Sequence, residues 1–215
     1  MASVQTWVEA DPFLMSTSDA PLVQLVVGGD PDPWRAIGLP VVDTVDGSIL
    51  LTSNCPVIWP GGDVPPGSVM LAVDPAFDST LDGIAMASVI ESIQPVASPL
   101  SVDHLVLNTD DLDRTCAEVG RVTGFELKRI RDAGGFRQGF HRLGRGGLII
   151  EVVDRPGVLE PQWWGFVITV DDLDAFVDSA GGLVGTPREA VQPGRWIATV
   201  SRDAGLGTPV AFMSR

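Results

Sequence analysis

The chain has 215 residues, of which 45% are hydrophobic and 20% are charged, a composition typical of a folded globular protein. Its 28 acidic residues outnumber its 14 basic residues, so the formal net charge is −14. Such a surface repels phosphate backbones, and Lys and Arg form no long cluster, which argues against nucleic acid as a partner.

The first elements predicted along the chain form a short strand–helix–strand series. Residues 21–39 read as a strand followed by a short helix, with Pro33 favourable early in that helix and a Gly-Leu stop. Three short strands are expected at 41–45, 48–53 and 55–59. This series is a degenerate copy of the two longer series that follow.

The two longer series cover residues 101–154 and 162–215. Both open with a strand that runs into the residues DDLD, with an offset of 61 residues between the copies (171 − 110). Each DDLD is predicted to open a helix, because Asp suits the positive end of the helix dipole. The apolar residues that follow make each helix amphipathic, and each helix is expected to end at glycine. Three strand-like segments follow each helix, at 125–132, 136–143 and 147–154 and at about 183–190, 194–201 and 208–214.

Each series therefore reads as a β-α-β-β-β unit, and the predicted fold class is α+β. One four-stranded sheet with one helix cannot bury its own core, so we expect units to pair around a cup. We assign residues 1–95 to a degenerate N-terminal region and residues 96–215 to a domain of two units. The N-terminal unit has no partner in this scheme, and its apolar sheet face predicts a homodimer.

Tandem β-α-β-β-β units with this strand and Asp-helix opening resemble the vicinal oxygen chelate superfamily. That superfamily includes glyoxalase I, extradiol dioxygenases and the bleomycin-resistance binding proteins. The resemblance rests on residues 103–115, 148–154 and 164–176, and the closing residues 190–214 are similar to actinobacterial glyoxalase-like proteins of unassigned function. It covers residues 101–215 well and the N-terminal unit loosely. Because this fold supports many reactions and some pure binders, the resemblance is specific for fold and weak for chemistry.

The resemblance also implies where a metal would bind. In the metal-dependent members, each unit supplies one ligand from its first strand and one from its last. In this chain the 101–154 unit supplies His104 and Glu151, but the 162–215 unit has Gly165 and Ala211, which cannot bind a metal. Gln24 occupies the position of His104 in the N-terminal unit and is of a type that glyoxalases use as a ligand. We expect no complete metal centre, and a divalent metal (Zn, Ni, Mn or Fe) at an incomplete site is the alternative that the resemblance implies.

His104 and Glu151 form a plausible pair on physical grounds as well. Glu151 interrupts the apolar strand 149–153, where a carboxylate needs a compensating cation, donor or metal. Three interpretations stay open: a hydrogen-bonded polar pair without further function, part of a metal site that needs a third ligand such as Gln24, or a general acid and base with pKa values shifted by burial.

Further side chains are candidates for contact with a ligand. Gln138 and Phe140 are expected to line the cavity, and Trp164 suits an apolar or aromatic molecule at its mouth, with core packing as the alternative. Arg195 could hold a ligand carboxylate or carbonyl with its fork of donors, or pair with a surface acid. His141 is expected at the surface or the rim of the cup.

We therefore predict a glyoxalase-like protein that handles a small organic molecule, either as a binder or as a metal-independent isomerase or lyase with His104 and Glu151 as catalytic residues. The alternative is a divalent-metal-dependent lyase or dioxygenase that uses the same pair with a further ligand. A module with an empty cup ranks last.

The remaining sequence features bear on the compartment. The N-terminal stretch lacks the basic and apolar regions of a secretory signal, and the longest apolar runs have only strand length. Cys55 and Cys116 form neither a disulfide framework nor a metal-binding pair. We expect a reduced, cytoplasmic protein without membrane association.

Overall fold

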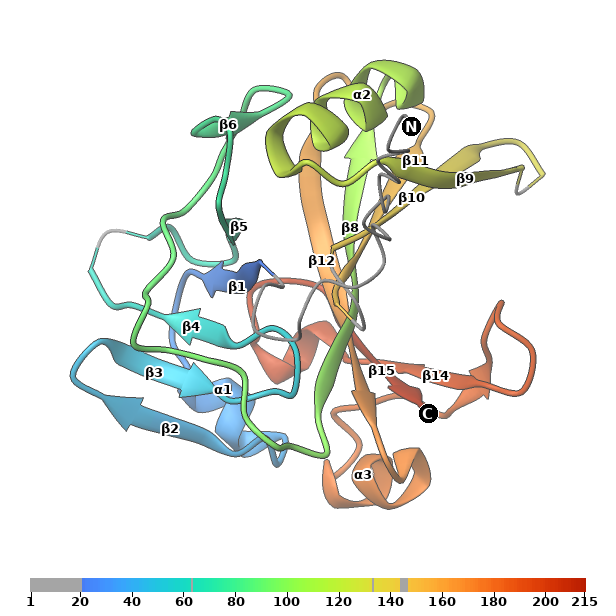
Figure 1. Cartoon of the computed structure of the whole chain (residues 1–215). Helices are drawn as coiled ribbons and strands as arrows, with labels where there is room; N and C mark the ends of the chain where they lie inside the picture. Colours follow the sequence, from blue (N-terminus) through green and yellow to red (C-terminus); the bar gives the residue numbers. More distant parts are fainter. Residues whose placement is uncertain (1–20, 63, 133, 144–146) are drawn as a thin grey trace, which may run out of the picture.

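The computed structural model describes residues 21–62, 64–132, 134–143 and 147–215. It contains three series of elements that we call the N-terminal, middle and C-terminal units (Figure 1). The N-terminal unit consists of β1 (Leu22–Val27), α1 (Asp32–Ala36), β2 (Val41–Thr44), β3 (Gly47–Leu50) and β4 (Val57–Trp59). It is followed by β5 (Val69–Asp74), β6 (Thr80–Leu81) and β7 (Ile84–Ala85).

The two other units are longer. The middle unit consists of β8 (Ser101–Thr109), α2 (Leu112–Thr123), β9 (Leu127–Asp132), β10 (Arg137–Arg142) and β11 (Ile149–Asp154). The C-terminal unit consists of β12 (Gln162–Val170), α3 (Leu173–Ser179), β13 (Arg188–Glu189), β14 (Trp196–Thr199), the 3-10 turn η1 (Arg202–Ala204) and β15 (Val210–Ser214).

All three units have the same topology. The last strand of each unit pairs parallel with the first strand, and each of the remaining strands pairs antiparallel with its neighbour. The strand orders are β2-β3-β4-β1, β9-β10-β11-β8 and β13-β14-β15-β12. An antiparallel pairing of β8 with β12 joins the middle and C-terminal units into one eight-stranded sheet. The predicted α+β class with paired β-α-β-β-β units is confirmed.

The two DDLD sequences start their helices in the same way. The second Asp of each, Asp111 and Asp172, is the N-cap, and its side chain accepts a hydrogen bond of 3.0 Å from the backbone N–H of Arg114 or Ala175. Helix α2 ends at Gly124, which has the left-handed φ of 74°. In the described part of the chain, no helix is long and apolar enough to cross a membrane.

Strand β5 completes the N-terminal sheet. It pairs antiparallel with β1, as β12 pairs with β8, and makes a five-stranded sheet in the order β2-β3-β4-β1-β5. It therefore occupies the place that the first strand of a fourth unit would take. The sequence prediction missed this role and treated the segment only as a connection.

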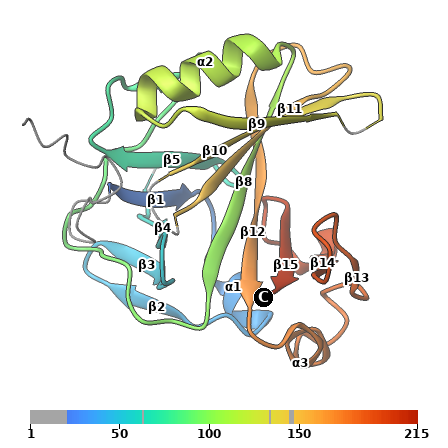
Figure 2. The same cartoon turned by 45° about the vertical axis from the view of Figure 1, so that its right-hand side comes forward.

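The two large sheets pack against each other and share one core. Val23 and Leu25 of β1 and Trp34 of α1 belong to the same buried cluster as Leu105 and Phe166 of the eight-stranded sheet. The Trp34 ring stacks on the Phe166 ring, with centroids 5.8 Å apart and an interplanar angle of 10°. Figure 1 shows the N-terminal sheet on one side of β8 and β12 and the outer strands of the larger sheet on the other, and Figure 2 shows β13, β14 and β15 on the side away from the N-terminal sheet.

This packing bears on the expected homodimer and on the expected domain boundary. The apolar face of the N-terminal unit is covered within the chain, so the physical reason given for a homodimer is wrong, and homodimerisation itself stays a prediction. The boundary between residues 95 and 96 also stays a prediction. The sheets do change between β7 and β8, but a single core cluster runs through both of them.

The other face of the N-terminal sheet is covered by the segment 86–96. Ile90 and Ile93 from this segment pack with Ile49 and Ile58. The fully buried Gln24 amide donates to the carbonyls of Ile90 (2.8 Å) and Ile93 (2.7 Å) and accepts from the Ile90 N–H (2.8 Å). The face that corresponds to the cup of the larger sheet is therefore filled by the chain itself.

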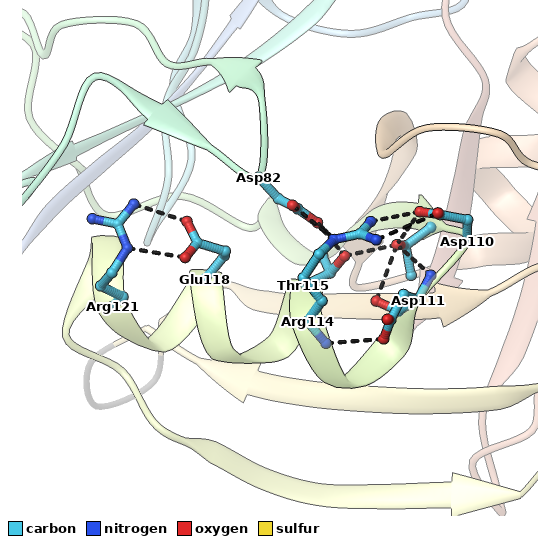
Figure 3. A network of polar contacts seen from close by, with 8 residues as sticks. Asp82, Asp110, Asp111, Arg114, Thr115, Glu118 and Arg121 are labelled. Carbon is cyan, nitrogen blue, oxygen red and sulfur yellow. Dashed lines mark hydrogen bonds and ion pairs between the residues drawn. The ribbon is translucent and has the colours of Figure 1, made fainter.

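Polar contacts fasten α2 to the β6–β7 turn (Figure 3). Asp82 in that turn accepts hydrogen bonds from Arg114 Nε (3.0 Å) and from the Thr115 hydroxyl. Arg114 also pairs with Asp110 at 2.5 Å. These contacts hold the helix that backs the middle unit, so they support the strands that carry the site.

Candidate functional site

A cavity of about 160 Å³ lies on the concave face of the eight-stranded sheet, which we call the cup. The middle unit contributes His104, Gln138, Phe140 and Glu151 to its wall, and the C-terminal unit contributes apolar side chains that include Ile197 and Met213. The wall thus comes from both units, as expected of a cup between paired units. Predicted contact residues Gln138 and Phe140 both line it.

His104 and Glu151 meet in this cavity. Strands β8 and β11 run parallel, with His104 opposite Ile149 and Val106 opposite Glu151, so the two side chains are diagonal neighbours on one face. His104 Nε2 lies 3.5 Å from Glu151 Oε2, and each side chain is only 14% exposed. The other carboxylate oxygen, Glu151 Oε1, accepts a hydrogen bond from the Gln138 amide.

Asp103 is a site residue that the sequence interpretation missed. Strict alternation along β8 would place Asp103 and His104 on opposite faces. However, the pairing of β8 with β12 shifts by one residue here, because Val167 lies opposite His104 and Ile168 lies opposite Val102. This bulge leaves Asp103 unpaired and lets it reach the side of His104. The sequence feature that could have identified Asp103 as a site residue is its charge within a mostly apolar strand.

Asp103 orients the imidazole of His104. The distance from His104 Nδ1 to Asp103 Oδ2 is 2.8 Å. A carboxylate can only accept, so Nδ1 carries the proton and Nε2 of the neutral ring is left as the acceptor that faces Glu151. The ring is thus fixed in one tautomer and one orientation.

Arg195 holds Asp103 in turn. Its Nη1 donates to Asp103 Oδ1 at 2.6 Å, its Nη2 to the Thr169 hydroxyl at 3.1 Å and its Nε to the Ser214 carbonyl at 2.8 Å. Arg195 was predicted to contact a ligand, but its donors are directed to these protein groups and it is not among the residues that line the cavity. It is a positioning residue for the Asp103–His104 pair.

The two carboxyl groups beside His104 have opposite pKa shifts. Burial acts to raise the pKa of Asp103, but hydrogen bonds from His104 and Arg195 outweigh it and lower this pKa to about 2. Burial raises the pKa of Glu151, while the nearby charges of His104 and Arg131 offset part of that effect. Asp103 is therefore a permanent anion near neutral pH, and Glu151 is the easier of the two to protonate.

Three other candidates lie outside the cup. Trp164 lines a separate hollow with Thr208 and Pro209. Gln24 belongs to the N-terminal sheet, where its amide is bound to backbone groups, so the structure does not bring it together with His104 and Glu151. The predicted rim position of His141 is wrong. That side chain is fully buried, and its Nδ1 bonds the Phe125 carbonyl at 2.8 Å.

The C-terminal half of the cup offers no counterpart of the His104–Glu151 pair. A side chain at Gly165 would place its Cβ 2.1 Å from the Pro209 carbonyl oxygen, so no ligating residue fits there. The position of Glu151 is taken by Ala211, which lies in a small apolar cluster with Val167 and Met213. Among the described residues, no group of three or more His, Cys, Asp or Glu side chains is placed to hold a metal ion. The residues present do not fit the four-ligand metal centre that the resemblance implies.

Comparison with known proteins shows similarity at the level of the fold. No protein-family model matches the chain, and no curated protein matches its sequence. A triple mutant of 4-hydroxymandelate synthase from Streptomyces coelicolor superposes with a TM-score of 0.63 at 14% identity, covering 92% of this chain and 92% of that chain. Methylmalonyl-CoA epimerase from Mycobacterium tuberculosis matches with a TM-score of 0.45 at 16% identity, over 58% of this chain and 95% of that chain. The chain therefore has the fold of the vicinal oxygen chelate superfamily, as its repeated units predicted.

Proposed function

We propose that the cup binds a small organic molecule and that His104 moves a proton on it without a metal ion, as in an isomerase or lyase. The observation that supports this proposal is the hydrogen-bonded series Arg195–Asp103–His104, which ends with His104 Nε2 at 3.5 Å from Glu151 inside the cavity. A base oriented by a buried carboxylate is a common arrangement for proton transfer.

Each residue has a distinct role in this proposal. His104 Nε2 accepts a proton from a carbon of the bound molecule, and the anionic Asp103 stabilises the imidazolium that forms. Protonated Glu151 donates a proton to a neighbouring atom of the same molecule, and the proton on His104 Nε2 then passes to Glu151 Oε2, 3.5 Å away, so that both residues are restored and the net result is a proton shift. The raised pKa of Glu151 increases the fraction of the protonated form that this step needs.

Deuterium exchange tests the proposal. The full chain, dialysed against EDTA, is incubated in D2O with a panel of 2-oxo carboxylates and small aromatic acids, and proton NMR follows exchange at carbon. We expect exchange with at least one compound and a loss of about 100-fold or more in His104→Ala and Asp103→Asn. Arg155→Gln, which changes an exposed residue away from the cup, serves as the control.

Two results would contradict the proposal. Compounds that bind without exchanging deuterium would leave a binding protein and remove the catalytic role. Elemental analysis of protein purified without chelator that found one stoichiometric metal, lost in both His104→Ala and Glu151→Ala, would favour a metal-dependent enzyme.

A further inference from the structure

Three arginines line the same cavity and have no assigned step in the proton transfer proposed above, apart from the effect of the Arg131 charge on the pKa of Glu151. Arg129 and Arg131 belong to β9, and Arg188 belongs to β13. Strands β9 and β13 are the two outer strands of the eight-stranded sheet, at opposite ends of its strand order. Positive charge from both edges of the sheet therefore meets at one cavity.

These three arginines line the cavity, whereas Arg142, Arg155 and Arg202, which likewise form no ion pair with a described residue, do not. Acidic residues outnumber basic ones 28 to 14, so a partner is available for nearly any exposed arginine. Several arginines do form ion pairs with carboxylates, namely Arg35, Arg114, Arg121, Arg137, Arg195 and Arg215. Within the part of the chain that the structure describes, no ion pair involves Arg129, Arg131 or Arg188.

The β9 arginines are placed by the strand pairing. Arg129 lies opposite Phe140 and Arg131 lies opposite Gln138, and all four residues line the cavity. The Arg129 guanidinium carbon is 4.5 Å from the centroid of the Phe140 ring, a cation–π contact that holds the charge over the cup. Charged side chains on an edge strand also protect a sheet from aggregation. That role would not require the arginine side chains to line a shared cavity.

We propose that the ligand of the cup is a small anion, with a carboxylate or phosphate group bound by Arg129, Arg131 and Arg188 and an apolar body against Phe140, Ile197 and Met213. A guanidinium group can donate two parallel hydrogen bonds to a pair of oxygens of either anion. The cavity of about 160 Å³ is close to the volume that holds a benzene-sized molecule. The anion would bind in the same cup in which His104 is proposed to transfer a proton, and only this choice of cup rests on the proposed function.

Calorimetric titration of the full chain with three probes of similar size tests the inference. Benzoate carries a carboxylate, phenyl phosphate carries a phosphate, and benzamide is a neutral analogue of benzoate. We expect at least one anion to bind at least tenfold more tightly than benzamide, and the preferred anion identifies the head group. Arg129→Gln and Arg188→Gln are each expected to weaken anion binding at least tenfold, whereas Arg155→Gln, with the same loss of charge outside the cup, should bind as the unmodified chain does.

Equal binding of benzamide and the anions, no binding of either anion at millimolar concentration, or unchanged affinity in both arginine variants would overturn the inference. Its failure is separable from that of the proposed function. Arginine-dependent binding without deuterium exchange would leave the anion site and remove the proton transfer. Exchange that depends on His104 but is unaffected by Arg129→Gln and Arg188→Gln would leave the proton transfer and remove the anion site.

Discussion

His104 Nε2 and Glu151 Oε2 lie 3.5 Å apart because β8 and β11 run side by side in parallel register. The contact joins the first and last strands of the middle unit, so it depends on the complete β-α-β-β-β unit. Asp103 lies on the other side of the His104 ring. The imidazole is therefore flanked by an ionised carboxylate, Asp103, and by a carboxyl group that is easier to protonate, Glu151.

Asp103→Asn should lower stability in a pH-dependent way. The folded-state pKa of Asp103 is about 2 against an ordinary value of 3.8, so its carboxylate stabilises the fold above about pH 4 by about 2 kcal/mol. That contribution is lost as the pH falls through 2. Urea unfolding at pH 7 and pH 3 should therefore show a larger difference between variant and unmodified chain at pH 7.

A suitable control for Asp103 is Asp171→Asn, which removes an exposed ion pair with Arg215. We expect it to cost less than about 1 kcal/mol at either pH. An equal loss at pH 7 and pH 3 in Asp103→Asn would show that its carboxylate is not selectively stabilised by His104 and Arg195.

Glu151→Gln should raise stability at alkaline pH. Burial raises the pKa of Glu151, so ionisation of this group costs free energy in the folded state. The cost is absent below the unfolded-state pKa and fully present above the folded-state pKa. The variant should have a higher Tm than the unmodified chain at pH 8 and the same Tm at pH 4. Glu189→Gln, at an exposed position on β13, is expected to leave Tm unchanged at both values, and a lower Tm of Glu151→Gln at pH 8 would contradict the prediction.

Gln24→Ala should destabilise the fold and leave the cup intact. The substitution leaves three backbone groups without their partner, the buried Ile93 carbonyl and the partly buried N–H and carbonyl of Ile90, at a cost of about 2 kcal/mol or more. Chemical denaturation measures the loss, and titration with benzoate checks the cup. The exposed Gln94 on the same segment is the control, with an expected change for Gln94→Ala within about 0.5 kcal/mol. Loss of benzoate binding in a folded Gln24→Ala variant would place Gln24 in the site.

Gly165→Ala should be strongly destabilising because the new Cβ would lie 2.1 Å from the Pro209 carbonyl oxygen. The atom in the way is backbone, so relief needs a shift of the strand, and we expect a loss of about 1–3 kcal/mol or more. Gly120→Ala in α2 is the matched control, since its Cβ would meet the Phe125 carbonyl oxygen at an ordinary 3.8 Å. It should raise stability by about 0.5–1 kcal/mol. A fully stable Gly165→Ala, measured by denaturation, would reopen this position to a ligating side chain.

The repeated units could be predicted because their signals are local. An Asp N-cap acts on backbone groups three residues away, and the apolar period of a helix or strand is read within one element. Asp111 and Asp172 start their helices for this reason, and all three short strands expected between residues 41 and 59 are present. The strand predicted at about 183–190 is reduced to the two residues of β13.

The errors have a different physical origin. Asp103 was missed because a bulge depends on how β12 pairs with β8, and neither strand reveals that register alone. Gln24 was matched to His104 by counting positions along the chain. Its environment, however, is set by Ile90 and Ile93, to which its amide donates hydrogen bonds and which follow it by 66 and 69 residues.

By itself the sequence determined three β-α-β-β-β units and the absence of ligating residues at Gly165 and Ala211, and together with the resemblance it predicted that His104 and Glu151 form a pair. Those properties depend on residue type and on spacing along the chain. Only the tertiary structure decided that Asp103 and Arg195 orient His104, that the N-terminal cup is filled by its own chain, and that arginines from both sheet edges share one cavity. Each of these depends on strand register and sheet curvature, which are set by contacts between residues far apart in the sequence.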